Sequence, residues 1–264
     1  STYYTSKDGT QIPLTYSYKA STQVNDDTPV FLYGYGGYNI SIRPSFTPKY
    51  VAWLELGGVF AVANIRGGGE FGKSWHDAGR LDNKQNVFDD FLYASKYLEA
   101  QNVGNRKSTV ISGRSNGGLL VGTTLIQNPD YFGATLPAVG VLDMLRFTEF
   151  TEGWGWRGDY GSPLINQDDF VRNLKISPYH QIKVKECYSP TLTTTGRRDD
   201  RVVPSHSYKF TARLQEYQGC DNPILLYDTP RAGHGSGNGV AMPKWKRIKL
   251  FSIEQAFALQ HVKS

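Results

Sequence analysis

The sequence has few of the features that mark disulfide-rich or metal-binding proteins. It contains two cysteines among 264 residues, Cys187 and Cys220, and they lack the CxxC spacing of redox and zinc motifs. We expect two free thiols rather than one disulfide, and this cysteine usage does not require an oxidising compartment. The sequence also has no HExxH motif and no cluster of cysteines and histidines, so it implies no metal and no other cofactor.

Long hydrophobic runs are absent as well. No apolar stretch approaches the roughly 18 residues of a membrane-spanning helix. The first residues, Ser1 to Thr5, are polar and aromatic, unlike a signal peptide. We therefore predict a cytoplasmic protein with no membrane partner. Internal repeats and low-complexity segments are also missing, and a length of 264 residues fits one α/β domain.

The charge balance is mildly basic, with a formal net charge of +5. A basic protein can bind nucleic acid through a patch of lysines and arginines. The longest basic cluster covers residues 244–249, where basic residues alternate with apolar ones, as on the solvated side of an amphipathic helix. We therefore predict a solvent-exposed helix face there and no nucleic-acid partner.

Segments with the patterns of strands and helices alternate along most of the chain. The Asp8-Gly9 turn predicts a β-hairpin over residues 3–18. Apolar residues recur at helical spacing over residues 86–100, with Asn86 as the N-cap. Further strands are expected at 28–32, 59–65, 108–112, 190–195 and 223–228, and further helices at 48–56, 117–127, 205–218 and 243–260. This alternation predicts an α/β fold with a mostly parallel central sheet and helices on both faces.

The segment most informative about chemistry is Gly113-x-Ser115-x-Gly117, which lies between a predicted strand and a predicted helix. This is the nucleophile-elbow pattern of the α/β-hydrolase fold. The tight turn leaves no space for a Cβ atom at either glycine. It exposes the Ser115 hydroxyl and points the backbone N–H of Asn116 at the same place. The alternative is a glycine-rich turn without catalytic function, but the flanking strand and helix favour a nucleophile.

A serine nucleophile requires a base, which in this fold follows it in the chain. Three of the five histidines come after Ser115 and lie away from the terminus: His180, His206 and His234. His206 falls early in a predicted helix, where a surface or capping role is usual, and His180 fits a polar loop. His234 follows a predicted strand and has glycines on both sides, which let the backbone approach another loop closely. We therefore predict His234 as the base.

The acid that orients the base should follow the strand predicted at 190–195. Asp199 and Asp200 both lie there, beside three arginines, and a surface salt-bridge cluster is the alternative. An oxyanion hole also needs a second donor beside the Asn116 N–H. The glycine-rich loop at residues 33–38 follows an early strand, and a tyrosine hydroxyl of this loop could be that donor. The residues alone do not choose between the two aspartates.

Six long motifs in the same order resemble the catalytic domain of the prolyl oligopeptidase family, and the resemblance runs over nearly the whole chain. They cover residues 32–41, 63–72, 113–120, 156–161, 199–204 and 232–235. The resemblance implies an α/β-hydrolase fold over residues 1–264 and a Ser115, Asp199 and His234 triad. It implies that Tyr35 and Asn116 bind the oxyanion, and that Arg201 binds a substrate carbonyl. It also implies a proline pocket in which Trp156 stacks on the ring, together with Tyr38, Asn116, Val141, Tyr160 and Val202.

The resemblance also implies the reaction, which is cleavage of proline-containing peptides after proline. Tyr38 departs from the family pattern, because many relatives have phenylalanine at this position. Relatives are also longer and carry a β-propeller, so a propeller segment of the same protein is an expected partner. A peptide macrocyclase or a broader serine hydrolase would use the same triad, and a specificity for basic residues is less consistent with the 156–161 motif. The other alternative is an inactive fragment that needs a complementing propeller segment.

Overall fold

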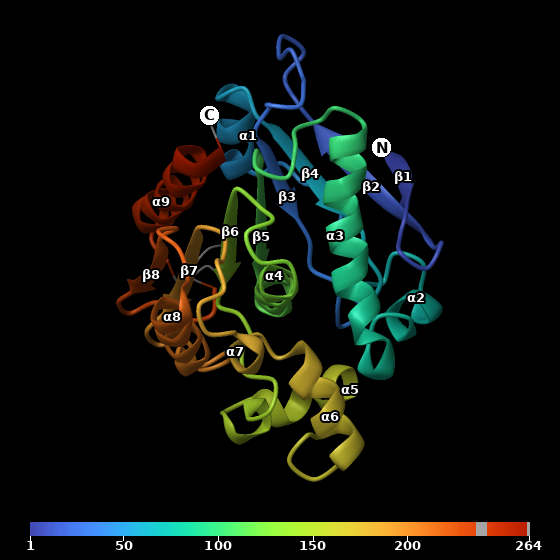
Figure 1. The fold of residues 1–264 in the computed structure, drawn as a ribbon, viewed down its shortest axis with the longest axis vertical. Helices are drawn as coiled ribbons and strands as arrows, with labels where there is room; N and C mark the ends of the chain where they lie inside the picture. Colours follow the sequence, from blue (N-terminus) through green and yellow to red (C-terminus); the bar gives the residue numbers. More distant parts are fainter. Residues whose placement is uncertain (236–241, 263–264) are drawn as a thin grey trace.

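One mixed sheet organises the described residues, 1–235 and 242–262 of this computed structural model (Figure 1). Its eight strands lie in the order β1-β2-β4-β3-β5-β6-β7-β8. β1 pairs antiparallel with β2, β2 pairs antiparallel with β4, and all other neighbours are parallel. The strands are β1 Thr2–Thr5, β2 Gln11–Ser17, β3 Val30–Tyr33, β4 Val59–Ala63, β5 Thr109–Arg114, β6 Ala134–Ala138, β7 Thr191–Gly196 and β8 Ile224–Thr229. The predicted mostly parallel sheet is therefore confirmed.

Helices cover both faces of the sheet, as the sequence predicts (Figure 1). Alternate residues of β3 show the two faces. Val30 and Leu32 join one apolar cluster with α3 and α4, whereas Phe31 joins another with α1 and α9. The helices are α1 Pro48–Glu55, α2 Lys73–Asp77, α3 Lys84–Ala100, α4 Asn116–Gln127, α5 Arg157–Tyr160, α6 Gln167–Ile176, α7 Pro178–Gln181, α8 Ser205–Tyr217 and α9 Lys244–Val262. In the part of the chain that the structure describes, none of them is long and apolar enough to cross a membrane.

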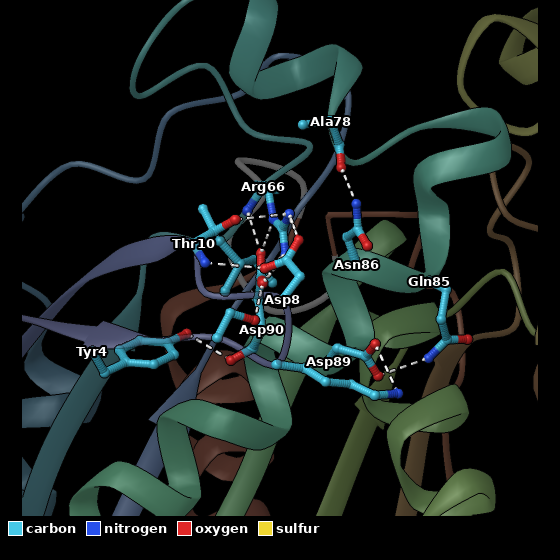
Figure 2. Close-up of polar contacts among 12 residues, drawn as sticks. Tyr4, Asp8, Thr10, Arg66, Ala78, Gln85, Asn86, Asp89 and Asp90 are labelled. Atoms are coloured by element: carbon cyan, nitrogen blue, oxygen red, sulfur yellow. Dashed lines mark hydrogen bonds and ion pairs between the residues drawn. The ribbon is translucent and has the colours of Figure 1, made fainter.

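The start of α3 differs from the prediction. The helix begins at Lys84, and Asn83 occupies the N-cap position, so the prediction that Asn86 caps the helix is wrong. Asn86 lies inside the first turns of α3 and its side-chain amide donates to the backbone oxygen of Ala78 at 3.0 Å (Figure 2). The helix therefore starts earlier than its first hydrophobic residue suggests, and its first buried side chain is that of Lys84.

A buried guanidinium docks the β1–β2 hairpin on α3 (Figure 2). Arg66 follows β4 and donates to both carboxylate oxygens of Asp90 on α3, at 2.9 Å from Nε and 2.6 Å from Nη2. Its Nη1 donates to Asp8 in the hairpin turn at 2.5 Å. From the hairpin, Ser6 Oγ donates to the Asp90 carboxylate and the Tyr4 hydroxyl donates to the Asp90 backbone oxygen. We call these five residues the hairpin cluster.

Cys187 and Cys220 form a disulfide with their Cα atoms 5.1 Å apart, so the prediction of two free thiols is wrong. The cysteines lie in the segments that lead into β7 and β8, and a parallel bridge between Glu186 and Gln218 brings these segments together. Because 33 residues separate the cysteines, their spacing in the sequence does not show this proximity. Disulfides are more usual in oxidising compartments, and the cytoplasmic location stays a prediction.

Candidate active site

Ser115 occupies a strained turn between β5 and α4. Its backbone has φ 58° and ψ −117°, in the left-handed range of φ that residues with a side chain rarely adopt. A Cβ atom at Gly113 would lie 2.2 Å from the backbone oxygen of Gly117, and one at Gly117 would lie 2.8 Å from the backbone oxygen of Gly34. The two glycines are therefore needed for the turn to close. The backbone N–H of Ser115 donates to Ala138 at the end of β6, at 2.9 Å, which fixes the turn to the sheet.

Asp199 lies against His234 at the ends of the neighbouring strands β7 and β8. The carboxylate oxygen Oδ2 of Asp199 is 2.8 Å from Nδ1 of His234. Its Oδ1 accepts from the backbone N–H groups of Arg201 and Val202 at 3.0 and 2.9 Å. A carboxylate accepts this hydrogen bond, so Nδ1 of His234 donates it, and in the neutral imidazole Nε2 then carries the lone pair. Asp200, in contrast, is exposed. The hydrogen bond to His234 is therefore made by Asp199, one of the two aspartates between which the sequence does not choose.

The turn of Ser115 and the loop of His234 lie together. Arg114, the residue before Ser115, donates from Nη2 to the backbone oxygen of His234 at 3.2 Å. The His234 side chain is 24% exposed, whereas the Asp199 side chain is fully buried. The imidazole is therefore partly accessible, while the carboxylate that holds it is buried. This arrangement suits a base that exchanges a proton with a bound substrate.

Tyr35 places a protonated hydroxyl beside Ser115. Burial raises the pKa of Tyr35 to about 12, and the nearby Ser115 side chain is among the smaller opposing influences. A phenol with this pKa keeps its proton at neutral pH and can donate it in a hydrogen bond. Asn116 begins α4, and its side-chain amide donates to the backbone oxygen of Tyr35 at 2.6 Å. The two residues that carry the predicted oxyanion donors are thus joined by a hydrogen bond.

Of the residues predicted for the proline pocket, Trp156 and Tyr160 pack against the ring of Phe147, in the apolar cluster that also includes α3 and α4. The ring of Phe147 stacks on Trp156 at 6.2 Å and meets Tyr160 edge to face at 5.4 Å. Val141 and Val202 belong to the same apolar cluster, and Tyr38 packs against it with its ring edge to face to Tyr160 at 5.7 Å. Arg201 is exposed, and its charge is close enough to Tyr35 and Tyr38 to oppose the rise in their pKa that burial causes. The structure therefore brings the three aromatic residues of the predicted pocket together, and the binding of proline there stays a prediction.

The two rejected histidines are structural in ways that the sequence did not indicate. The expectation of a surface or capping role for His206 is wrong, because His206 is 1% exposed and its Nδ1 accepts from the backbone N–H of Asp143 at 3.1 Å. His180 lies in the short helix α7 rather than in a loop, and its Nδ1 is 2.8 Å from Ser177 Oγ. Neither shares the hydrogen bond to Asp199 that His234 makes.

Lys84 and Asp159 are buried polar residues of the site to which sequence reasoning assigned no role. Asp159 accepts from the backbone N–H of Tyr38 at 2.8 Å, and its other oxygen is 2.9 Å from Nε2 of His76. Lys84 donates to the backbone oxygen of Gly36 at 2.9 Å. A signal for Lys84 was present, because it lies three and four residues before the apolar positions 87 and 88 and therefore on the buried stripe of α3.

Comparison with known proteins identifies close relatives over nearly the whole chain. A family model described as the prolyl oligopeptidase family matches residues 44–264. Prolyl endopeptidase of Elizabethkingia meningoseptica is 48% identical over 251 residues, which cover 95% of this chain and 36% of that protein. A dual-function macrocyclase-peptidase of Amanita bisporigera is 42% identical over 241 residues, which cover 89% of this chain and 33% of that protein.

Solved structures agree with the sequence comparison. The structure of prolyl oligopeptidase B from Galerina marginata, bound to a 35mer hydrolysis and macrocyclization substrate, matches with a TM-score of 0.92 at 37% identity. The match covers 98% of this chain and 36% of that one. This confirms the α/β-hydrolase fold predicted from the sequence. The chain spans about a third of the length of the relatives it matches, at 36% and 33% of the two proteins compared.

Proposed function

Because this chain belongs to the prolyl oligopeptidase family, we propose that residues 1–264 form the catalytic domain of a serine peptidase that cleaves peptides after proline. The observation that carries the proposal is the hydrogen bond of 2.8 Å between His234 Nδ1 and the buried Asp199, beside the strained turn of Ser115. A histidine oriented by a buried carboxylate, in a loop that contacts the nucleophile turn through Arg114, is the arrangement that acyl transfer requires.

In the proposed reaction, Ser115 Oγ attacks the carbonyl carbon of the proline residue while Nε2 of His234 takes the hydroxyl proton. Asp199 stabilises the imidazolium that forms and keeps the proton on Nδ1. The negative charge that develops on the substrate oxygen is bound by the backbone N–H of Asn116 and the hydroxyl of Tyr35. His234 then gives its proton to the leaving amine, which leaves an acyl-enzyme on Ser115. Water attacks this ester with the same base and releases the acid.

The preference for proline follows from the chemistry of the pocket. Proline offers a flat apolar ring and no backbone N–H, so it needs an aromatic wall and no charged partner. Trp156 supplies that wall, and it is held from behind by Phe147 at 6.2 Å. Arg201 lies at the exposed edge, where its guanidinium can donate to a backbone carbonyl of the peptide. Tyr38, Tyr160, Val141 and Val202 enclose the ring.

Peptide macrocyclisation is the second candidate. The specific observation that favours it is the identity of 42% to a macrocyclase-peptidase. In that reaction the amine of the same peptide, rather than water, attacks the acyl-enzyme, so the same residues serve both outcomes. Incubation with a long proline-containing peptide would separate the two by mass, because the cyclic product is one water lighter than the linear hydrolysis product.

The partner we propose is the remainder of a longer protein, including a β-propeller segment that covers the mouth of the site. The support is that the matched relatives are about three times as long as this chain, with 36% and 33% of their length aligned. An isolated catalytic domain would then act slowly and would not discriminate strongly against long peptides. A cytoplasmic location, and the lack of nucleic-acid or membrane partners, remain predictions from the sequence.

The proposal is tested by substituting the nucleophile. Ser115→Ala should lower kcat on a proline-amide substrate by about a million-fold, because removal of a triad serine has this effect in a well-studied hydrolase. The same variant should lose covalent labelling by a fluorophosphonate and keep its circular dichroism spectrum. The unsubstituted protein should cleave the proline amide far faster than the matching alanine amide. Retention of more than a few per cent of activity by Ser115→Ala would show that the nucleophile is misassigned.

A further inference from the structure

Lys84 is a buried cation whose hydrogen-bond acceptors are both neutral. It starts α3, and it is 2% exposed. Its Nζ donates to the backbone oxygen of Gly36 at 2.9 Å and to the side-chain oxygen of Asn116 at 3.2 Å. Burial of an ammonium group is costly unless something in the fold compensates it. An apolar residue would suit this position on the buried stripe of the helix, so the presence of lysine calls for an explanation.

The two acceptors of Lys84 belong to the two segments that carry the proposed oxyanion donors. Gly36 directly follows Tyr35, and Asn116 supplies its own backbone N–H. The Asn116 side chain links the segments a second time, because its Nδ2 donates to the Tyr35 backbone oxygen at 2.6 Å. The Tyr160 hydroxyl donates to the same Asn116 oxygen as Lys84, at 2.7 Å. We call Lys84, Gly36, Asn116, Tyr35 and Tyr160 the oxyanion-loop cluster.

We propose that Lys84 is a positioning residue that fixes the two oxyanion donors, Tyr35 and Asn116, relative to each other and to Ser115. This inference rests on the proposed function, because it assigns a role in that reaction. Lys84 does not touch the substrate. It holds the Gly36 carbonyl and the Asn116 amide, and through them it sets where the Tyr35 hydroxyl and the Asn116 N–H point. A misplacement of about 1 Å in such donors can cost on the order of 100-fold in rate.

The surroundings of Lys84 make this role dependent on pH. Burial lowers the pKa of Lys84 to about 8, and the charge of Asp159 opposes this shift. The other groups on this side are the Tyr160 ring, with its centroid 5.5 Å from Nζ, and His76 and Tyr38, which both bond to Asp159. The ammonium form therefore predominates below about pH 8 and is lost above it, so the hold on the oxyanion donors weakens on the alkaline side.

An alkaline loss of activity from this cause is distinct from unfolding. The pKa of Lys84 is about 8 in the folded chain and 10.5 is the ordinary value. Between these values the unfolded chain binds more protons at this residue than the folded chain does. The contribution of Lys84 to the free energy of unfolding therefore rises as the pH rises through this window. Activity should fall over the range in which this group makes the fold relatively more stable.

The experiment compares Lys84→Met with Lys96→Met in the protein that contains this chain. Lys96 lies on the exposed side of the same helix, with Nζ 4.5 Å from the Tyr93 ring, so it controls for loss of a lysine from α3. Lys84→Met should lower kcat on a proline amide by about 10- to 100-fold with KM changed less than about 2-fold, because the donors act mainly in the transition state. Lys96→Met should match the unsubstituted protein.

The rate constant for labelling of Ser115 by a fluorophosphonate is the second readout. It needs the oxyanion donors but no proline, so it should fall by a similar factor in Lys84→Met. It should also decline above about pH 8 in the unsubstituted protein, and this decline should be absent in Lys84→Met. In Lys84→Arg the decline of the labelling rate should move to a pH beyond the measured range, because a guanidinium keeps its charge there.

The possible outcomes separate this inference from the proposed function. A protein that is labelled but cleaves no proline amide contradicts the proposed function, and the labelling rates still decide the role of Lys84. A folded Lys84→Met variant that is labelled at the unsubstituted rate overturns the inference. If Lys84→Met does not fold, the pH profile decides. A labelling rate of the unsubstituted protein that does not fall between pH 7.5 and 9.5, roughly the range around a pKa of about 8, also overturns it.

Discussion

Two buried cations belong to α3 or contact it, and their surroundings differ. The guanidinium of Arg66 in the hairpin cluster meets the carboxylates of Asp90 and Asp8 (Figure 2). The ammonium of Lys84 in the oxyanion-loop cluster meets a backbone carbonyl and an amide oxygen. Contact with Asp90 and Asp8 raises the pKa of Arg66 although burial opposes it, whereas burial lowers that of Lys84 to about 8. Arg66 is therefore a permanent charge, and Lys84 is a titratable one.

The difference shows how one helix serves both the fold and the site. A cation neutralised by two carboxylates joins three segments of chain and has no need to change its state. The buried charge of a cation that is bound only by neutral groups is poorly compensated. In this chain that cation, Lys84, lies where the proposed reaction needs a precise geometry of two loops. We therefore expect substitutions in the hairpin cluster to change stability and substitutions around the active site to change rate.

After the loss of the nucleophile, the largest effect on the active-site side should come from Asp199. Asp199→Asn should lower kcat by roughly ten-thousand-fold, because the asparagine favours the wrong tautomer of His234. Asp200→Asn is the matched control, since Asp200 is exposed and should tolerate the change. Steady-state rates on a proline amide measure both, and chemical denaturation should show similar stabilities. A larger loss in Asp200→Asn would assign the acid to the neighbouring residue.

Substitution of Arg66 should lower the stability of the fold and leave the turnover rate unchanged. Arg66→Met leaves Asp90 buried without its partner, and removal of one member of a buried pair costs about 3–5 kcal/mol. The Asp90 side chain is fully buried, and that of Arg66 is 5% exposed. Arg197→Met is the control, because Arg197 forms an exposed pair with Asp228 and should leave the unfolding midpoint almost unchanged. The turnover of the molecules that remain folded should be unaltered, and a specific loss of kcat would break the comparison.

Tyr35 tests whether the oxyanion loop acts in the transition state. Tyr35→Phe should lower kcat by about 100- to 1000-fold, which is the usual effect of losing one such donor. KM should change little, because the hydrogen bond forms as charge develops on the substrate oxygen. The hydroxyl stays protonated, with a pKa of about 12, so the loss should not depend on pH between 6 and 8, a range far below that value. An effect confined to KM would make Tyr35 a substrate-binding residue.

The smallest effect concerns the disulfide. Replacement of Cys187 and Cys220 by serine should lower the free energy of unfolding by about 2–4 kcal/mol, since the bridge closes a loop and restricts the unfolded chain. The rate on a proline amide should remain near that of the unsubstituted protein, because the bridge joins the segments before β7 and β8 rather than the loops after them. Treatment with a reductant should reproduce the loss of stability. Equal stability with and without the bridge would contradict this prediction.

Much of the fold could be predicted because its central segments have long, regular patterns. The continuous apolar runs of β3 and β4 and the periodic stripe of α3 each indicate one type of element. β6 was not located, because Ala134–Ala138 has small residues and a proline and so lacks a strand pattern. The Cys187–Cys220 bridge could not be predicted either. It depends on the pairing of Glu186 with Gln218, which exists only in the assembled structure.

The candidate site also contains residues that a local pattern predicts and residues that only the assembled structure reveals. Ser115 is marked by a local motif with a steric cause, and Asp199 by its resemblance to a family motif. Their catalytic roles remain predictions, although the structure places Asp199 and not Asp200 against His234. Lys84 was missed because a lysine at the start of a helix usually faces solvent. The periodicity of α3 places Lys84 on the buried stripe, but its hydrogen bonds to the oxyanion loop and to α4 depend on the assembled structure.

The order in which the sheet is completed has a consequence for synthesis. The nucleophile turn follows β5, whereas His234 follows β8, which comes last among the strands of the described chain. A ribosome delivers these parts in sequence, so the growing chain has its serine long before it has its base. The nascent protein should therefore be unable to cut itself or its neighbours until the sheet is nearly complete. In refolding, the appearance of hydrolysis should lag behind the gain of helical signal and report the last strand pairing.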